Sequence, residues 1–249
     1  MVYKLFKALY GLRQAPRAWN IRLDKVLKDL NFKRSPREYA LYRREDQRGV
    51  LIVRVYVDDL IVTGSSAKEI ENFKNQMRKN FEMSDLGQPS YYLGIEVVQQ
   101  NRGIAICQEG YATKVLKNAN MWDCNPTKYP MEPGLQLTNE DKTELVDPTM
   151  YKSIIGCLRY LTHTRPDINY AVGVANRFME MPRVTHLQAV KHLLRYIKGT
   201  LSFGIQYTRN GCGKLIGYSD SSHANDRVDG KSTTGMIFYY GDGSFAWSG

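Results

Sequence analysis

The stretch VRVYVDDLIVTG, from Val53 to Gly64, carries two adjacent carboxylates in the middle of an otherwise apolar and β-branched run. Such a run favours a buried strand, and two neighbouring negative charges repel each other. The sequence therefore predicts two strands that meet at a tight turn carrying Asp58 and Asp59. Two interpretations stay open at this point: the pair lies in a solvated turn, or it binds something positive such as a metal ion.

Composition limits the class of protein. The 249 residues are 43% hydrophobic and 24% charged, which is ordinary for a soluble globular chain of one large or two small domains. The four cysteines form no CxxC or Cys/His cluster, so neither a zinc site nor a disulfide framework is indicated. No apolar run approaches the roughly 18 residues of a membrane span, and the N-terminus lacks a signal-peptide core. We expect an intracellular protein with no membrane partner.

The positive charge of the chain is concentrated around the aspartate pair. The net charge is +10, and residues 1–95 hold 18 Lys and Arg against 11 Asp and Glu, whereas residues 206–249 hold four of each. A basic field favours a polyanion as partner, with nucleic acid first among the candidates. A merely soluble basic surface is the alternative that charge alone leaves open.

The remaining periodicities predict an α+β fold. Apolar residues at helical spacing from Trp19 to Leu30 predict an amphipathic helix over 17–31. Ser66 and Glu69 predict a capping box for a helix that runs to about Asn80. A hairpin is expected around 101–103, and a polar linker with four prolines over 125–148. Further helices are expected over 111–120, 150–162, 167–180 and 185–198, and strands over 91–98, 104–107, 203–207, 214–220 and 235–240.

The aspartate pair suits one kind of chemistry in particular. Two carboxylates on consecutive residues at a hairpin tip can each reach a divalent cation, and Mg²⁺ prefers anionic oxygen. Two such cations about 4 Å apart support in-line displacement at phosphorus, by activating the attacking hydroxyl and neutralising the leaving pyrophosphate. A site of this kind usually takes a third carboxylate from elsewhere in the chain.

Several motifs resemble those of one family. YVDD (56–59) resembles the catalytic motif of reverse transcriptases, KALYGLRQAPRAW (7–19) is similar to the signature of copia-type retrotransposon polymerases, and YYLGIEV (91–97) resembles their primer-grip segment. TRPDINYAV (164–172), LRYIKGT (194–200), GYSDSSHAND (217–226) and STTG (232–235) follow in family order. On these motifs the chain is identified as a member of the copia-type Pol polyproteins, over essentially its whole length.

The resemblance implies three regions. Residues 1–98 correspond to a partial reverse transcriptase palm, with the YVDD hairpin and the primer-grip segment. Residues 99–205 correspond to a mainly helical thumb or connection. Residues 206–249 correspond to the first strands of a truncated ribonuclease H-like domain.

The resemblance also assigns roles to residues near the pair. Asp58 and Asp59 match the two adjacent catalytic, metal-binding aspartates of the palm, and the implied cofactor is Mg²⁺ or Mn²⁺. Tyr56 and Val57 are expected to pack near the primer end.

A second group of residues matches the nucleotide-binding and template-binding loop of the family. Gly11, Gln14 and Pro16 match the loop that opens a helix beside the nascent base pair, where glycine permits close approach of the backbone. Tyr10 is expected near the incoming nucleotide. Pro16 is equally typical of a proline that simply starts a helix.

Two further matches lie later in the chain. Leu93 and Gly94 match the turn that positions the primer strand. Asp220 matches the first metal-binding aspartate of the ribonuclease H domain, but Ser222 and His223 stand where the family commonly has a second acid and a tryptophan.

The family pattern predicts that parts of both sites lie outside this chain. The first catalytic aspartate of the family is expected upstream of KALYGL, before Met1, and the later nuclease acids are expected after Gly249. We therefore expect a fragment that is inactive alone and lacks ribonuclease H activity.

Two functional hypotheses from different classes follow. The first is an RNA-directed DNA polymerase that copies an RNA or DNA template from a primer with deoxynucleoside triphosphates, together with the remainder of a Pol polyprotein. The second is a catalytically inactive nucleic-acid-binding remnant of a degenerate element. A third possibility is that the chain boundaries are a gene-model artefact of a longer polyprotein.

Overall fold

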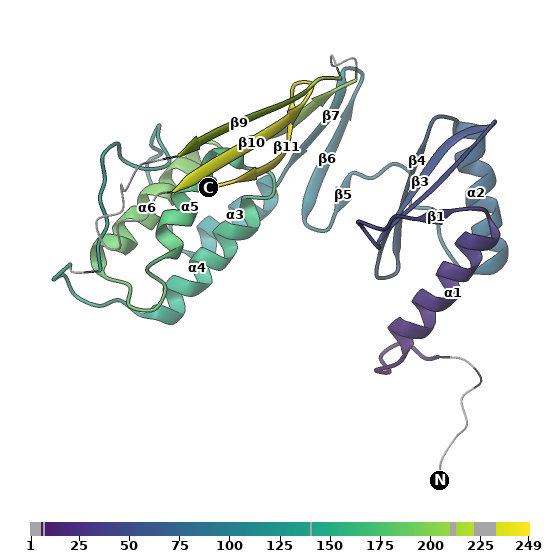
Figure 1. Ribbon diagram of the computed structural model, residues 1–249. Coiled ribbons are helices and arrows are strands. Elements are labelled where there is room, and N and C mark those ends of the chain that lie inside the picture. The colour runs from purple at the N-terminus through teal and green to yellow at the C-terminus, as the bar shows by residue number, and fades with distance from the viewer. Residues whose placement is uncertain (1–5, 7, 140, 210–212, 222–232) are drawn as a thin grey trace, which may run out of the picture. The chain divides into compact units, whose positions relative to one another are not determined.

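The computed structural model describes residues 6, 8–139, 141–209, 213–221 and 233–249. The chain divides into two compact units, Met1–Gly87 and Gln88–Gly249, and each is described by itself (Figure 1). Both units combine helices with antiparallel sheets, so the predicted α+β class is confirmed. None of the helices in the described ranges is long and apolar enough to cross a membrane.

The first unit is a four-stranded antiparallel sheet with two helices. The strands lie in the order β1-β2-β3-β4, which is also their order along the chain. The predicted hairpin at the aspartate pair and both predicted helices are present, with the first helix starting two residues earlier than expected. The elements are α1 (Ala15–Asp29), β1 (Lys33–Arg34), β2 (Leu41–Asp46), β3 (Gly49–Tyr56), β4 (Asp59–Gly64) and α2 (Ala67–Asn80).

Both helices of the first unit pack on one face of its sheet. Along β3, alternate residues are buried, and they join a single cluster with residues of α1 and α2. Alternation places the intervening residues on the opposite face, which no helix of this cluster covers. The buried members of the cluster are Leu23, Leu27, Phe32, Tyr42, Leu51, Val53, Val55, Phe73 and Met77.

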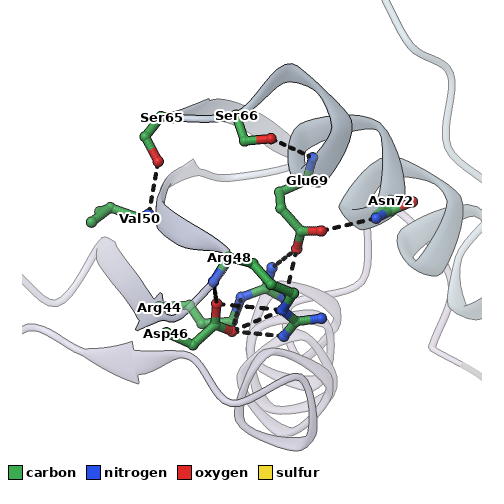
Figure 2. Close-up of polar contacts among 8 residues, drawn as sticks. All are labelled: Arg44, Asp46, Arg48, Val50, Ser65, Ser66, Glu69 and Asn72. Atoms are coloured by element: carbon green, nitrogen blue, oxygen red, sulfur yellow. Dashed lines mark hydrogen bonds and ion pairs between the residues drawn. The ribbon is translucent and has the colours of Figure 1, made fainter.

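A buried ion pair ties the sheet to α2, as Figure 2 shows. The Arg44 guanidinium donates to the Glu69 carboxylate at 2.7 Å, and only 7% and 11% of these side chains are exposed. The predicted capping box is therefore only half formed. The Ser66 hydroxyl accepts the backbone N–H of Glu69 at 3.4 Å, but the Glu69 side chain binds Arg44 and Asn72 instead of the N-cap backbone.

Removing the acidic partner of this pair is expected to destabilise the first unit. In Glu69→Gln the buried Arg44 guanidinium loses its 2.7 Å ion pair and keeps only the longer one with Asp46, at 3.6 Å, which costs about 3 kcal/mol. Amide hydrogen exchange of β2 and α2 measures the loss. Glu71→Gln is the matched control, because the Glu71 carboxylate is 55% exposed and its contacts with Lys74 and Arg78 contribute about 0.5 kcal/mol at most. Equal effects of the two variants would contradict this account.

The second unit contains two antiparallel sheets and a group of helices. The first sheet has the order β5-β6-β7-β8, and the second has the order β11-β10-β9. Strand β8 pairs with β7 although about a hundred residues separate them along the chain, with Ile205 opposite Ile106. The elements are β5 (Tyr91–Tyr92), β6 (Ile95–Gln100), β7 (Gly103–Cys107), α3 (Glu109–Asn118), α4 (Pro148–Leu161), a 3₁₀ helix η1 (Pro166–Ile168), α5 (Asn169–Asn176), α6 (Val184–Gly199), β8 (Gly204–Thr208), β9 (Leu215–Ser221), β10 (Thr234–Tyr240) and β11 (Gly243–Ser248).

Two predicted elements differ from the structure. The strand expected over 91–98 is split at Leu93 and Gly94, because both residues have positive φ, 50° and 79°, and reverse the chain. The helix expected over 167–180 is a 3₁₀ turn followed by α5, which ends at Asn176. After Asn176 the backbone N–H groups of Arg177 and Phe178 donate to the carbonyls three residues back, those of Val174 and Ala175, so the α-helical pattern stops there.

The helices of the second unit share one core. Residues of α3, α4, α5 and α6 form a continuous buried cluster, and the Tyr151 hydroxyl inside it donates to the carbonyl of Ala175 at 2.9 Å. The two compact units meet at Gly87 in the sequence. The region boundaries that the resemblance implies, after residues 98 and 205, fall inside strands β6 and β8.

His186, at the start of α6, is fully buried in its neutral form. Its ring stacks on Phe178 with 3.9 Å between centroids. Nδ1 lies 3.1 Å from the backbone N–H of Arg183 and accepts from it, so Nε2 carries the proton and donates to the Thr138 carbonyl at 3.1 Å. Burial lowers the pKa of His186, because the charged ring would lose its hydration. Protonation at Nδ1 would also place its N–H against the backbone N–H of Arg183, so that two donors would face each other.

The second unit is therefore expected to lose stability on mild acidification. The folded pKa of His186 lies below the unfolded value near 6.5, so its contribution is complete above that pH and is lost as the pH falls below it. The nearby Asp141 carboxyl has a pKa of about 2, set by hydrogen bonds from Thr185 and Thr143, and does not titrate in this range. Thermal melts between pH 7.5 and 5.5 measure the slope. His186→Gln should flatten the dependence of the melting temperature on pH, and His163→Gln, at an exposed ring, should leave it unchanged. The reverse result would contradict the claim that His186 causes the loss of stability.

Candidate active site

The two aspartates lie at the tip of the β3–β4 hairpin. Tyr56 pairs with Asp59, so Val57 and Asp58 are the two central residues of the turn. Asp58 and Asp59 are both exposed. Within the described part of the chain neither carboxylate forms an ion pair or a hydrogen bond with another side chain. The pair is thus free to accept a ligand from solvent.

Val57 holds the turn in an unusual backbone conformation. Its φ is +54°, which is an outlier for a β-branched residue because Cβ crowds the neighbouring carbonyl. Such a conformation costs about 1–3 kcal/mol and persists only where surrounding contacts fix it. The Val57 side chain is 61% exposed, so its own packing does not supply those contacts.

Trp19 of α1 contacts this turn. Its indole Nε1–H donates to the carbonyl of Val57 at 2.7 Å, across 38 residues of sequence. The same indole packs edge-on against Phe81, with 4.9 Å between ring centroids. Sequence periodicity assigned Trp19 to the core stripe of the helix and missed the contact with the turn.

The loop from Tyr10 to Pro16 leads directly into α1. Tyr10 is 98% exposed, and Gly11 has φ +89°, a conformation that suits glycine. Gln14 is the N-cap residue and Pro16 stands in the first turn, as predicted for a helix-start proline. Trp19 follows Pro16 by three residues, so about one helical turn separates this loop from the residue that contacts the aspartate turn.

The open face of the first sheet combines both signs of charge. Tyr56 and Asp59 are directly opposite each other and therefore share a face. Arg54 lies two residues before Tyr56 on the same face, and Arg43 pairs with Ile52 there. Guanidinium groups beside exposed carboxylates can bind phosphate oxygens while a cation occupies the carboxylates.

The second candidate turn belongs to the second unit. Tyr92 pairs with Ile95, which leaves Leu93 and Gly94 as a two-residue turn with positive φ at both positions, typical of type I′. The Tyr160 hydroxyl of α4 donates to the carbonyl of Leu93. A Cβ at position 94 would also collide with the Tyr160 hydroxyl, so both φ and space require glycine there.

Asp220 lies on β9, exposed, and pairs with Gly235 on β10. Ser222 and His223, which depart from the family pattern, lie outside the described residues. Among the residues that the structure describes, no three or more His, Cys, Asp and Glu side chains gather where they could hold a metal ion. Asp58 and Asp59 supply two unpaired, solvent-facing carboxylates, which fit part of the donor set of a hard divalent cation.

A family of known function matches the first half of the chain. Residues 1–133 match the family described as reverse transcriptase (RNA-dependent DNA polymerase), and this range contains the aspartate hairpin, the loop before α1 and the Leu93–Gly94 turn. The chain belongs to the reverse transcriptase family. Its motifs and its curated relatives place it as the reverse transcriptase region of a copia-type retrotransposon Pol polyprotein.

The curated relatives cover almost the whole chain. The chain is 39% identical over 247 residues to a retrovirus-related Pol polyprotein from transposon RE1 of Arabidopsis thaliana, spanning 99% of this chain and 17% of that polyprotein. It is 35% identical over 263 residues to a Pol polyprotein from transposon TNT 1-94 of Nicotiana tabacum, spanning 99% and 19%. The chain thus spans less than a fifth of the length of these polyproteins.

A shorter relative matches along most of its own length. A putative transposon Ty5-1 protein of Saccharomyces cerevisiae is 32% identical over 249 residues, which cover 99% of this chain and 81% of that protein. No solved structure matches the chain with significance. The family assignment therefore rests on sequence.

Replacing Val57 by glycine is expected to relieve the backbone of the turn. Glycine adopts positive φ freely, and the gain outweighs the greater freedom of the unfolded chain, so Val57→Gly should stabilise the first unit by about 1 kcal/mol. Val55→Gly is the matched control on the same strand: it removes a side chain only 8% exposed and should cost about 3 kcal/mol. Hydrogen exchange of β3 and β4 measures both. Comparable destabilisation by the two variants would show that Val57 is not strained.

Proposed function

We propose that Asp58 and Asp59 are two of the metal-binding catalytic aspartates of a reverse transcriptase palm and bind Mg²⁺ or Mn²⁺. The observation that carries this proposal is their position: two unpaired carboxylates at the exposed tip of a hairpin, with Asp59 on the sheet face opposite the helices. When bound, a pair of divalent cations activates the primer hydroxyl and neutralises charge on the leaving pyrophosphate.

The residues of the chain itself have binding roles in this proposal. Tyr56 and Val57 pack near the primer end, and Arg43 and Arg54 of the open face attract the phosphates of the primer-template. Both Arg residues lie on strands of the sheet that carries the turn, and the Arg43 guanidinium also forms an exposed ion pair with Glu45 at 2.7 Å.

The loop before α1 binds the incoming deoxynucleoside triphosphate and the template base in this proposal. Tyr10 supplies an exposed aromatic ring, and Gly11 allows the backbone to approach the base pair closely. Gln14 and Pro16 fix the entry into α1.

The later motifs extend the proposal to the second unit. Leu93 and Gly94 form the turn that positions the primer strand, and the helices of this unit act as thumb or connection. Asp220 is the candidate for the first acid of a nuclease-like unit. The protein works with an RNA or DNA template, a primer and the remainder of a Pol polyprotein.

A second candidate function is nucleic-acid binding without synthesis. The charge of residues 1–95, 18 basic against 11 acidic side chains, and the arginines of the open face favour it independently of any chemistry at the turn. Primer-template affinity and primer extension therefore have to be measured on the same protein.

The double variant Asp58→Asn, Asp59→Asn separates the two functions. With a homopolymer RNA template, a labelled primer and Mn²⁺, the wild type joined to the remainder of a Pol polyprotein should extend the primer, and the variant in the same context should lose on the order of a thousandfold in rate. Primer-template affinity, measured by fluorescence anisotropy, should be unchanged or tighter because two negative charges are gone.

The matched control is Asp29→Asn, Glu82→Gln. It removes the same two charges from exposed positions of the first unit and should leave both readouts unchanged. Binding without extension by the folded wild type would establish the non-catalytic function instead. Extension that survives in the double variant would refute the role of the aspartates.

A further inference from the structure

We infer that Trp19 is a positioning residue for the aspartate turn, and that its indole N–H holds the backbone that presents Asp58 and Asp59. This inference deepens the proposed function of the turn and rests on it for the consequence in metal binding. The contact itself, from the indole Nε1 to the carbonyl of Val57 at 2.7 Å, is independent of that function.

The turn needs such a contact because its own ladder cannot supply one. The last cross-strand pair joins Tyr56 to Asp59, so the carbonyl of Val57 lies beyond the ladder. The indole provides a contact at the residue whose φ is strained, where an external contact is required to keep the conformation populated.

Trp19 is itself held by the core of the first unit. Leu23 and Leu27 follow it at intervals of four residues on the same face of α1, and both are fully buried. Phe81, directly after α2, packs edge-on against the indole and limits its rotation. The indole N–H is therefore aimed by two helices and the sheet, not by the turn.

The second unit contains the same arrangement at its own turn. Leu93, like Val57, is the first central residue of a two-residue turn and has positive φ, +50°. Its carbonyl also accepts from an aromatic side chain on a distant helix, the hydroxyl of Tyr160. In both motif turns the carbonyl of the first central residue thus accepts from an aromatic donor on a helix of the same unit.

Trp19→Phe removes the N–H and keeps an aromatic ring against Phe81. Amide hydrogen exchange at residues 56–60 should accelerate by roughly 2- to 10-fold, the effect of one hydrogen bond. The affinity for Mn²⁺ alone, measured by electron paramagnetic resonance of the free ion, should weaken by a similar factor. Neither readout requires polymerase activity.

Trp247→Phe is the matched control. The indole of Trp247 donates to the carbonyl of Thr162 at 3.0 Å, so this variant removes the same kind of bond within the second unit. It should leave exchange at residues 56–60 and Mn²⁺ affinity unchanged. Unchanged exchange at the turn in Trp19→Phe, or an equal change in both variants, would overturn the inference.

The wild type gives a test that does not depend on a variant folding. The indole N–H of Trp19 should exchange more slowly than that of Trp122, whose indole has no hydrogen-bond acceptor among the described residues. Equal exchange would overturn the inference. If the turn is held but the wild type does not bind Mn²⁺, the positioning role stands and the proposed function of the aspartates fails.

Discussion

The register between β3 and β4 is the constraint on which the candidate site depends. With Tyr56 opposite Asp59, the apolar residues Leu60 and Val62 face the helices, and Asp59 faces the open side of the sheet. A slip of one residue would turn β4 over and place the Asp59 carboxylate against an apolar core, at a desolvation cost of several kcal/mol. The burial of α1 and α2 on one face therefore decides where the acidic side chain points.

Fixing the register leaves the turn with a conformation that its residues do not favour. Two residues must reverse the chain, and the first of them is a valine with positive φ. The indole of Trp19 compensates at this point, and the hydroxyl of Tyr160 does so at the Leu93–Gly94 turn. Motifs that are far apart in the sequence, KALYGLRQAPRAW and YVDD, are thereby joined by the hydrogen bond from Trp19 to Val57.

Local periodicity predicted the parts of the fold that depend on neighbouring residues. The alternation of Val53 and Val55 and the helical spacing from Trp19 to Leu30 identified the hairpin and α1, and the two aspartates were placed at the tip. The periodicity of apolar residues predicts which face of a helix or strand is buried, but not which other element covers that face. The pairing of β8 with β7 therefore could not be predicted, and neither could the use of the Glu69 carboxylate by Arg44, 25 residues away.

The backbone at the two turns was the least predictable part of the site. Valine and leucine disfavour positive φ, so nothing in their identity signals a turn at Val57 or at Leu93. The run YYLGIEV has the composition of one strand, and only the resemblance to the family motif indicated a turn at Leu93 and Gly94. The structure has a turn there, in contact with Tyr160. The hydrogen bond from Trp19 to the Val57 carbonyl was also missed, because the helical spacing assigned Trp19 to the core.

Paramagnetic broadening of backbone amide signals by Mn²⁺ tests the central claim most directly. If Asp58 and Asp59 form a cation site, added Mn²⁺ will broaden the signals of residues 56–60 first, and the effect will disappear in the Asp58→Asn, Asp59→Asn variant. Broadening that begins elsewhere in the first unit, or that persists in the double variant, would contradict the claim that this turn binds the metal.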